Sequence, residues 1–216
     1  MYQIISIVVL LITLAVIALH CIAFPPARER VWNPVKKLVH LFTLLCIEQK
    51  LSVAGVVRKL VYLLALLCFA VLAITGFYPT LVLNEHISGY LLMIHATFAP
   101  IFAICLAVLA VMWASRCSFT YNDWPGLKHF VRRVALIKNA IEEPLTKSNR
   151  LLEKATFWLT ILLALPLILS ILLSMLPYFG TDWQELLLAL HRWTALVFAV
   201  VVFVNTYLMI RIQMKQ

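Results

Sequence analysis

Charged residues are scarce in this chain of 216 residues. Asp, Glu, Lys and Arg together make up 12% of it, whereas 64% of the positions are hydrophobic and the mean hydropathy is +0.99. A soluble domain is only about half apolar, and a short soluble protein this hydrophobic would expose large apolar patches and aggregate. The scarcity of charge therefore excludes a soluble cytosolic enzyme and indicates an integral membrane protein.

The sequence also lacks the alternating pattern of β-strands and contains instead five long apolar runs. Each run reaches the roughly 20 residues that a helix needs to cross about 30 Å of hydrocarbon. The runs are Ile4 to Phe24, Leu60 to Leu83, Gly89 to Trp113, Ala155 to Phe179 and Gln184 to Ile210. Because a chain in lipid must satisfy its own backbone hydrogen bonds, all five are predicted to be transmembrane α-helices. The first has neither a basic start nor a small-residue cleavage site, so we expect a retained helix and not a signal peptide.

Residues 25–59 connect the first two runs and are too short and too charged for a further span. Apolar residues recur there on a helical period, at Val35, Leu38, Val39, Phe42 and Leu45. This pattern predicts an amphipathic helix lying in the membrane interface. We therefore expect an all-α integral membrane protein in two parts. Residues 1–59 hold an N-terminal transmembrane helix and a cytoplasmic interfacial segment, and residues 60–216 hold the other four spans.

Two of the connections between runs, residues 84–88 and 180–183, contain no Lys or Arg. Of the 18 basic residues, 17 lie in residues 28–59, in residues 116–154 and in the C-terminal tail. The positive-inside rule places these segments in the cytoplasm, so we expect a multi-pass protein of the inner (cytoplasmic) membrane with its N-terminus outside and its C-terminus inside. Since orientation accounts for the net charge of +9, no nucleic-acid partner is expected.

Two histidines, His95 and His191, lie within predicted spans, where ionisable residues are costly and often functional. Each is about 9 to 10 Å below the outer end of its run. Two imidazoles at matched depth on different helices suit axial ligation of one haem iron. A closed zinc site wants four ligands, which the sequence does not supply at this depth. A simpler interpretation is that each histidine hydrogen-bonds a Ser, a Thr or a carbonyl on a neighbouring helix.

The chain has no Cys-x-x-Cys-His motif, so any haem is expected to be of the non-covalent b type. Arg192 directly follows His191 and is the one basic residue outside the cytoplasmic segments. Its guanidinium suits a haem propionate; snorkelling to the outer interface is the alternative.

Several stretches resemble the cytochrome b subunits of membrane formate dehydrogenases, nickel-iron hydrogenases and thiosulfate reductases. They are residues 58–62, 75–77, 86–95, 190–193 and 205–207. This resemblance covers about residues 58–210 and implies a four-helix bundle that passes electrons between an extracytoplasmic redox subunit and the quinone pool. It also implies that His95 and His191 hold the family's outer haem.

The chain departs from this family at the inner haem. Tyr62 and Asn205 stand where the family has histidine ligands, which suggests a variant with a single haem near the outer face. A second haem held by His20 and His40 is an alternative outside the family pattern. Another is a quinone near Tyr62 and Asn205, because its carbonyls accept hydrogen bonds from a phenol and a carboxamide.

These patterns favour an electron-transfer subunit of an oxidoreductase complex that is not catalytic alone. Its expected partners are an extracytoplasmic redox subunit, either a cytochrome c or an iron-sulfur protein, together with quinone and membrane lipid. The main alternative is a haem-free membrane anchor or assembly subunit of such a complex. A small transporter is disfavoured, because the sequence lacks the broken helices and midplane charges expected of one.

Overall fold

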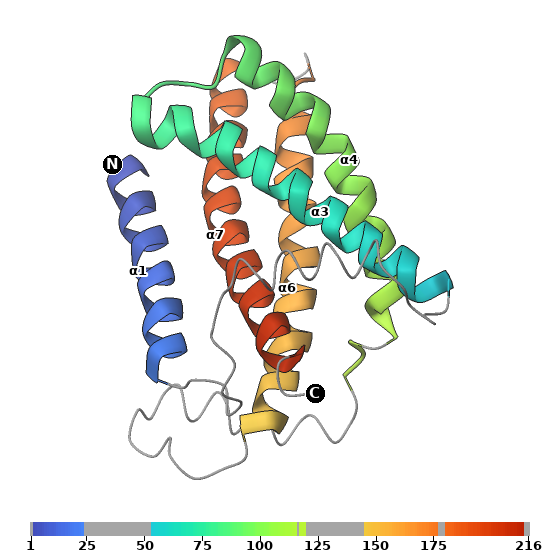
Figure 1. Cartoon of the computed structure of the whole chain (residues 1–216). Helices are drawn as coiled ribbons and strands as arrows, with labels where there is room; N and C mark the ends of the chain where they lie inside the picture. Colours follow the sequence, from blue (N-terminus) through green and yellow to red (C-terminus); the bar gives the residue numbers. More distant parts are fainter. Residues whose placement is uncertain (1, 24–52, 116, 120–144, 177–179, 214–216) are drawn as a thin grey trace. The chain divides into compact units, whose positions relative to one another are not determined.

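The computed structural model describes residues 2–23, 53–115, 117–119, 145–176 and 180–213 (Figure 1). In these ranges the chain forms helices and no strand. The elements in order are α1 (Tyr2–Ala23), α3 (Val53–Phe77), η1 (Tyr78–Leu83), α4 (Gly89–Ala114), α6 (Leu145–Ser174) and α7 (Thr181–Gln213). The predicted interfacial helix, with His40, lies outside the described residues.

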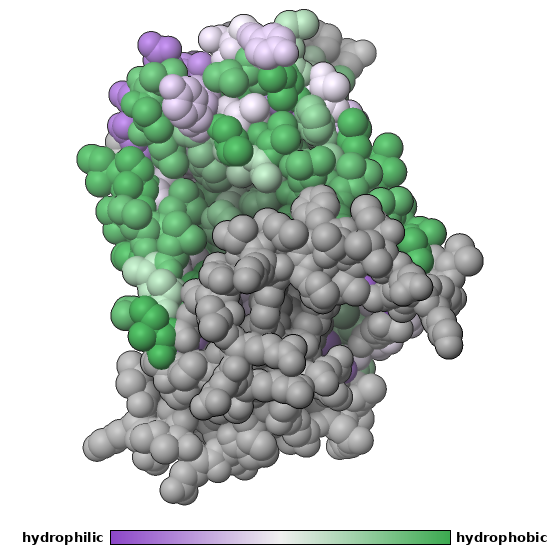
Figure 2. Space-filling view, in the orientation of Figure 1, coloured by the Kyte–Doolittle hydropathy of each residue, from purple (hydrophilic) through white to green (hydrophobic). Residues whose placement is uncertain are grey.

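Among the described residues, five helical segments are long and apolar enough to cross a membrane. They are Tyr2–His20, Gly55–Leu83, Gly89–Ala114, Lys154–Ser174 and Thr181–Leu208. Figure 2 shows hydrophobic side chains over most of the visible described surface, and large residues such as Leu11, Leu67 and Leu162 are more than half exposed. Lipid is the solvent that tolerates such a surface. The prediction of an all-α membrane protein with five spanning helices is confirmed.

The fourth span ends earlier than its hydropathy predicts. Helix α6 stops at Ser174, five residues before the predicted end at Phe179. Its last turn tightens, because the Leu176 N–H donates to the Leu173 carbonyl three residues earlier at 3.2 Å. Pro177 follows in the sequence, and the residue before a proline is disfavoured in the helical conformation. Hydropathy alone does not register this stop.

Several threonine hydroxyls within the spans are satisfied by their own helices. Thr13 donates to the Val9 carbonyl, Thr97 to the Met93 carbonyl and Thr160 to the Thr156 carbonyl, each at 2.8 Å. An unsatisfied polar group in hydrocarbon costs several kcal/mol. These bonds to the residue four positions earlier let threonine occur in membrane helices without that penalty.

The chain divides into two compact units that differ from the two sequence-predicted parts, and the division at residues 59 and 60 stays a prediction. The first unit comprises Met1–Ile7 and Pro25–Trp113. Within it α3 and α4 run in opposite directions and contact each other through aromatic side chains. Phe69 contacts Phe102 with ring centroids 6.3 Å apart, and Tyr62 stacks on Trp113 at 5.8 Å with the ring planes 16° apart.

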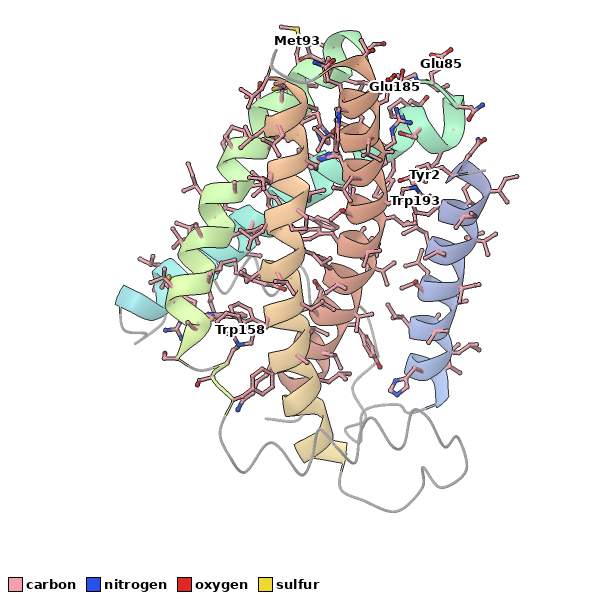
Figure 3. The ribbon with its side chains drawn as sticks, turned by 180° about the vertical axis from the view of Figure 1, so that it is seen from behind. Tyr2, Glu85, Met93, Trp158, Glu185 and Trp193 are labelled. Carbon is pink, nitrogen blue, oxygen red and sulfur yellow. The ribbon has the colours of Figure 1, made fainter. Side chains whose placement is uncertain are left out.

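The second unit comprises Val8–Phe24 and Ala114–Gln216. Its helices α6 and α7 lie side by side and antiparallel (Figures 1 and 3). The Thr156 hydroxyl on α6 donates to Asn205 Oδ1 on α7 at 3.0 Å. A hydrogen bond between His20 Nδ1 and Tyr207 Oη joins α1 to α7 at 2.5 Å, with the two rings edge to face.

The second predicted run is one span but not one kind of helix. Its last six residues form the π-helix η1, which contains Pro79 in its first turn. Proline has no N–H to donate to the carbonyl four residues earlier, so the α-helical ladder cannot continue unchanged through it. The Asn84 N–H instead donates to the Pro79 carbonyl, five residues back, and Asn84 ends the element in the left-handed conformation with φ of 56°.

Candidate functional site

His95 lies in the first unit, six residues after Gly89, the first residue of α4. At 1.5 Å per residue this is about 9 Å along the helix. The half-buried imidazole turns toward α3, where its Nδ1 is 2.9 Å from the hydroxyl oxygen of Thr75. Thr75 is itself only 5% exposed. The first candidate ligand is therefore held through one ring nitrogen by a buried side chain of its partner helix.

Gly76 provides the space for the His95 ring. A Cβ atom at this position would lie 3.2 Å from His95 Cε1 and 3.7 Å from Nδ1. The first distance is closer than ordinary van der Waals contact, so any larger residue would press on the imidazole. Thr75 thus contributes a hydrogen bond to the ring, and Gly76 leaves the space that the ring needs.

His191 lies in the second unit on α7, ten residues after Thr181, the first residue of the helix. Its Nδ1 donates to the Leu167 carbonyl on α6 at 2.9 Å. The Ser170 hydroxyl, only 2% exposed, donates to the same carbonyl at 3.0 Å and is 3.4 Å from His191 Nδ1. Because a carbonyl only accepts hydrogen bonds, Nδ1 of His191 carries the proton and Nε2 carries the lone pair.

The simpler interpretation of the two histidines is confirmed as far as Nδ1 is concerned. His95 bonds a threonine hydroxyl and His191 bonds a main-chain carbonyl, each on the neighbouring helix of its own unit. This does not compete with metal ligation. A metal-bound histidine uses one ring nitrogen for the metal and commonly donates from the other to a carbonyl or another acceptor. The same Nδ1 hydrogen bonds are therefore expected whether the histidines only join helices or also bind a metal.

The other sequence-predicted site residues have packing partners. Tyr62 stacks on Trp113 within the first unit. In the second unit, Asn205 accepts a hydrogen bond from Thr156, and His20 bonds Tyr207. These contacts give each residue a structural role within its unit. The quinone site and the second haem stay predictions.

Arg192 follows His191 on α7 and is half-buried. Successive residues of an α-helix point about 100° apart, so the guanidinium and the imidazole leave the helix in different directions. Exposed acidic residues lie near the ends of two spans. Glu85 lies in the loop after η1 and Glu185 in the first turns of α7 (Figure 3).

Within the described parts of the chain, no group of three or more His, Cys, Asp or Glu side chains could hold a metal ion. A haem iron does not need such a group, since the porphyrin occupies four coordination positions and leaves two for the protein. Cys68 and Cys105 are buried within α3 and α4, where a thiol packs as a small apolar group.

Comparisons with protein-family models, curated proteins and solved structures found no match to this chain.

Sequence reasoning missed Thr75, Leu167 and Ser170 as partners of the histidines. A usable signal existed in the spacing. Thr75 and His95 are each ten positions from residue 85, which lies in the loop between η1 and α4. Residues equidistant from a short loop between antiparallel helices lie at similar heights, so Thr75 could have been paired with His95. No such symmetry marks Ser170, which lies four residues before the end of α6, whereas His191 lies ten residues after the start of α7.

Proposed function

We propose that this chain is a b-type haem subunit of a membrane oxidoreductase complex, with His95 and His191 as the axial ligands of one haem iron. The observation that carries the proposal is the common anchoring of the two histidines. Each lies on a different spanning helix and is held at Nδ1 by a hydrogen bond to the helix beside it. Axial histidines need this arrangement, because the bond at one nitrogen orients the ring and leaves the other nitrogen to the iron.

The donor set fits a haem better than it fits other metal groups. Two imidazoles complete a six-coordinate haem iron, whereas structural zinc takes four protein ligands. When bound, haem supplies a one-electron couple. The chain's own residues would then have three tasks: His95 and His191 would hold the iron, the apolar helix surfaces would keep water from it, and Arg192 would balance a propionate charge.

The proposed pathway connects quinone in the membrane with an extracytoplasmic redox subunit, a cytochrome c or an iron-sulfur protein. The resemblance of residues 58–210 to cytochrome b subunits supports it, and so does the placement of basic residues, which favours an inner-membrane protein with its N-terminus outside. The partner would then dock on the short outer loops. A quinone near Tyr62 and Asn205 belongs to the same proposal.

The second candidate is a haem-free membrane anchor or assembly subunit. The observation that favours it is that the sequence-predicted polar site residues take part in helix packing. Asn205 ties α7 to α6, and His20 ties α1 to α7, which is what a purely structural bundle requires.

An absorption spectrum of the purified full chain, with haem counted per chain, separates the two candidates. We expect a reduced b-type spectrum at about one haem per chain, consistent with bis-histidine ligation. The spectrum should be lost in His95→Ala and in His191→Ala. His86→Ala is the matched control, because His86 is an exposed histidine of the loop before α4 and its loss should leave the haem in place.

Three results would contradict the proposal. A wild-type protein without haem favours the anchor. Two haems per chain would overturn the interpretation of Tyr62 and Asn205 as lost ligands. Full haem content in either ligand variant would show that the iron is held by other residues.

A further inference from the structure

The buried hydroxyl of Thr75 has three polar neighbours but only one proton to donate. Its oxygen is 2.8 Å from the Val71 carbonyl and 3.3 Å from the Leu72 carbonyl, both on α3. It is also 2.9 Å from His95 Nδ1 on α4. The two carbonyls can only accept hydrogen bonds. The position of the single hydroxyl proton therefore determines whether His95 Nδ1 donates or accepts the hydrogen bond.

One proton arrangement satisfies all of these contacts. The Thr75 proton lies between its oxygen and the Val71 carbonyl, as in other threonines of membrane helices. The Thr75 oxygen then presents only lone pairs to His95, so Nδ1 must carry a proton and donate it. With the proton reversed, the Thr75 oxygen and the Val71 carbonyl oxygen would meet at 2.8 Å with no hydrogen between them. The neutral imidazole of His95 thus keeps its lone pair on Nε2.

The two candidate ligands reach the same tautomer by different means. His191 donates to a main-chain carbonyl, which no substitution of a side chain removes. His95 donates to a side chain, and the absence of a Cβ at Gly76 leaves room for the ring beside it. The state of His95 is therefore the one that a single substitution can change.

We propose that Thr75 is a positioning residue that fixes the tautomer of His95 and strengthens Nε2 as an electron donor. A hydrogen bond from Nδ1 to an acceptor raises the basicity of the opposite nitrogen. The effect on iron rests on the proposed haem function, but the tautomer does not, because Thr75 and His95 meet without any cofactor. Thr75 acts through His95 and is not itself a ligand.

The experiment uses the full chain in detergent with ¹⁵N-labelled histidine. The ¹⁵N shifts of the imidazole distinguish a proton on Nδ1 from one on Nε2, and the His95 signal is assigned by its loss in His95→Gln. In the haem-free wild type we expect His95 to carry its proton on Nδ1. Thr75→Val, which keeps the shape but removes the hydroxyl, should shift His95 toward the other tautomer, and Thr75→Ser should restore it.

A second measurement adds haem to the same proteins. Thr75→Val should weaken haem binding about 10- to 100-fold, the usual cost of removing the hydrogen-bond partner of a ligating histidine. It should also raise the midpoint potential, since a weaker donor favours ferrous iron. Thr160→Val is the matched control, because Thr160 is about as buried, at 7% exposed, and its hydroxyl bonds only a carbonyl of its own helix.

The outcomes separate this inference from the haem proposal. A proton on Nε2 of His95 in the wild type overturns the inference without any variant. So does a Thr75→Val protein with the tautomer, affinity and potential of Thr160→Val. If the wild type binds no haem, the haem proposal fails, and the ¹⁵N measurement still decides the role of Thr75.

Discussion

At the scale of single residues, Gly76 leaves the space that the ring of His95 occupies. We predict that Gly76→Ala weakens haem binding roughly tenfold, because the new Cβ would press on Cε1 from 3.2 Å and displace the ring. The fold should survive, since alanine favours a helix over glycine by about 0.5 to 1 kcal/mol. Haem titration followed by thermal unfolding checks both parts.

Gly180→Ala is the control for this prediction. A Cβ at Gly180 meets nothing within 4 Å, so its haem affinity should equal that of the wild type. Equal affinities in the two alanine variants would mean that the contact at Gly76 does not constrain the histidine.

A second residue-scale prediction concerns the hydrogen bond between Thr156 and Asn205. We expect a double-mutant cycle of Thr156→Val and Asn205→Leu to give a coupling of about 0.6 kcal/mol, the average for hydrogen bonds between membrane helices. The measurement is the free energy of unfolding of the four proteins in detergent. A coupling near zero, combined with altered quinone-dependent haem reduction in Asn205→Leu alone, would instead favour a ligand at Asn205.

The sequence identifies His95 and His191 because an ionisable side chain at membrane depth is rare and costly. It identifies the acceptors less well, for a physical reason. The acceptor of His191 is the carbonyl of Leu167, and every residue carries a carbonyl, so no residue type marks the position. Thr75 is visible as a residue type, but its relation to His95 depends on how α3 and α4 are aligned.

At the scale of elements, one side-chain contact ties the end of α1 to α7. We predict that His20→Ala and Tyr207→Phe each lower the unfolding free energy by about 0.5 to 1.7 kcal/mol, the range for such bonds between membrane helices. The haem content should stay unchanged in both. Chemical unfolding and the absorption spectrum measure the two effects separately. A lower haem content in His20→Ala would favour the alternative of a second haem held by His20.

The helices themselves follow from hydropathy, whereas their internal hydrogen-bond register does not. The run Leu60 to Leu83 is uniformly apolar, so it predicts one span and says nothing about where an α-helix becomes a π-helix. The structure shows how that end is held: the Gln3 side chain donates to the Leu81 carbonyl at 2.8 Å, and Thr80 donates to the Gly76 carbonyl. Both bonds depend on neighbours that a sliding hydropathy window cannot register.

At the scale of the whole molecule, the distribution of basic residues predicts the orientation in the membrane. We expect periplasm-active reporters to work when fused in the loops at residues 84–88 and near residue 180. A fluorescent protein fused to the C-terminus should be active in the cytoplasm, because 17 of 18 basic residues lie on that predicted side. The reverse pattern of activities would contradict the orientation and would move the proposed partner to the other face.

Each histidine forms its hydrogen bond with the helix that precedes it in its own unit, and this affects the order of events during synthesis. His95 finds Thr75 upstream of it, and His191 finds Leu167 upstream of it. Each acceptor is thus synthesised before its histidine, by 20 residues in the first pair and 24 in the second. The two histidines are 96 positions apart, about 5 to 20 s of synthesis at typical rates. The first imidazole can therefore be oriented in the bilayer before the second exists, and under the proposed function haem binding would have to wait for α7.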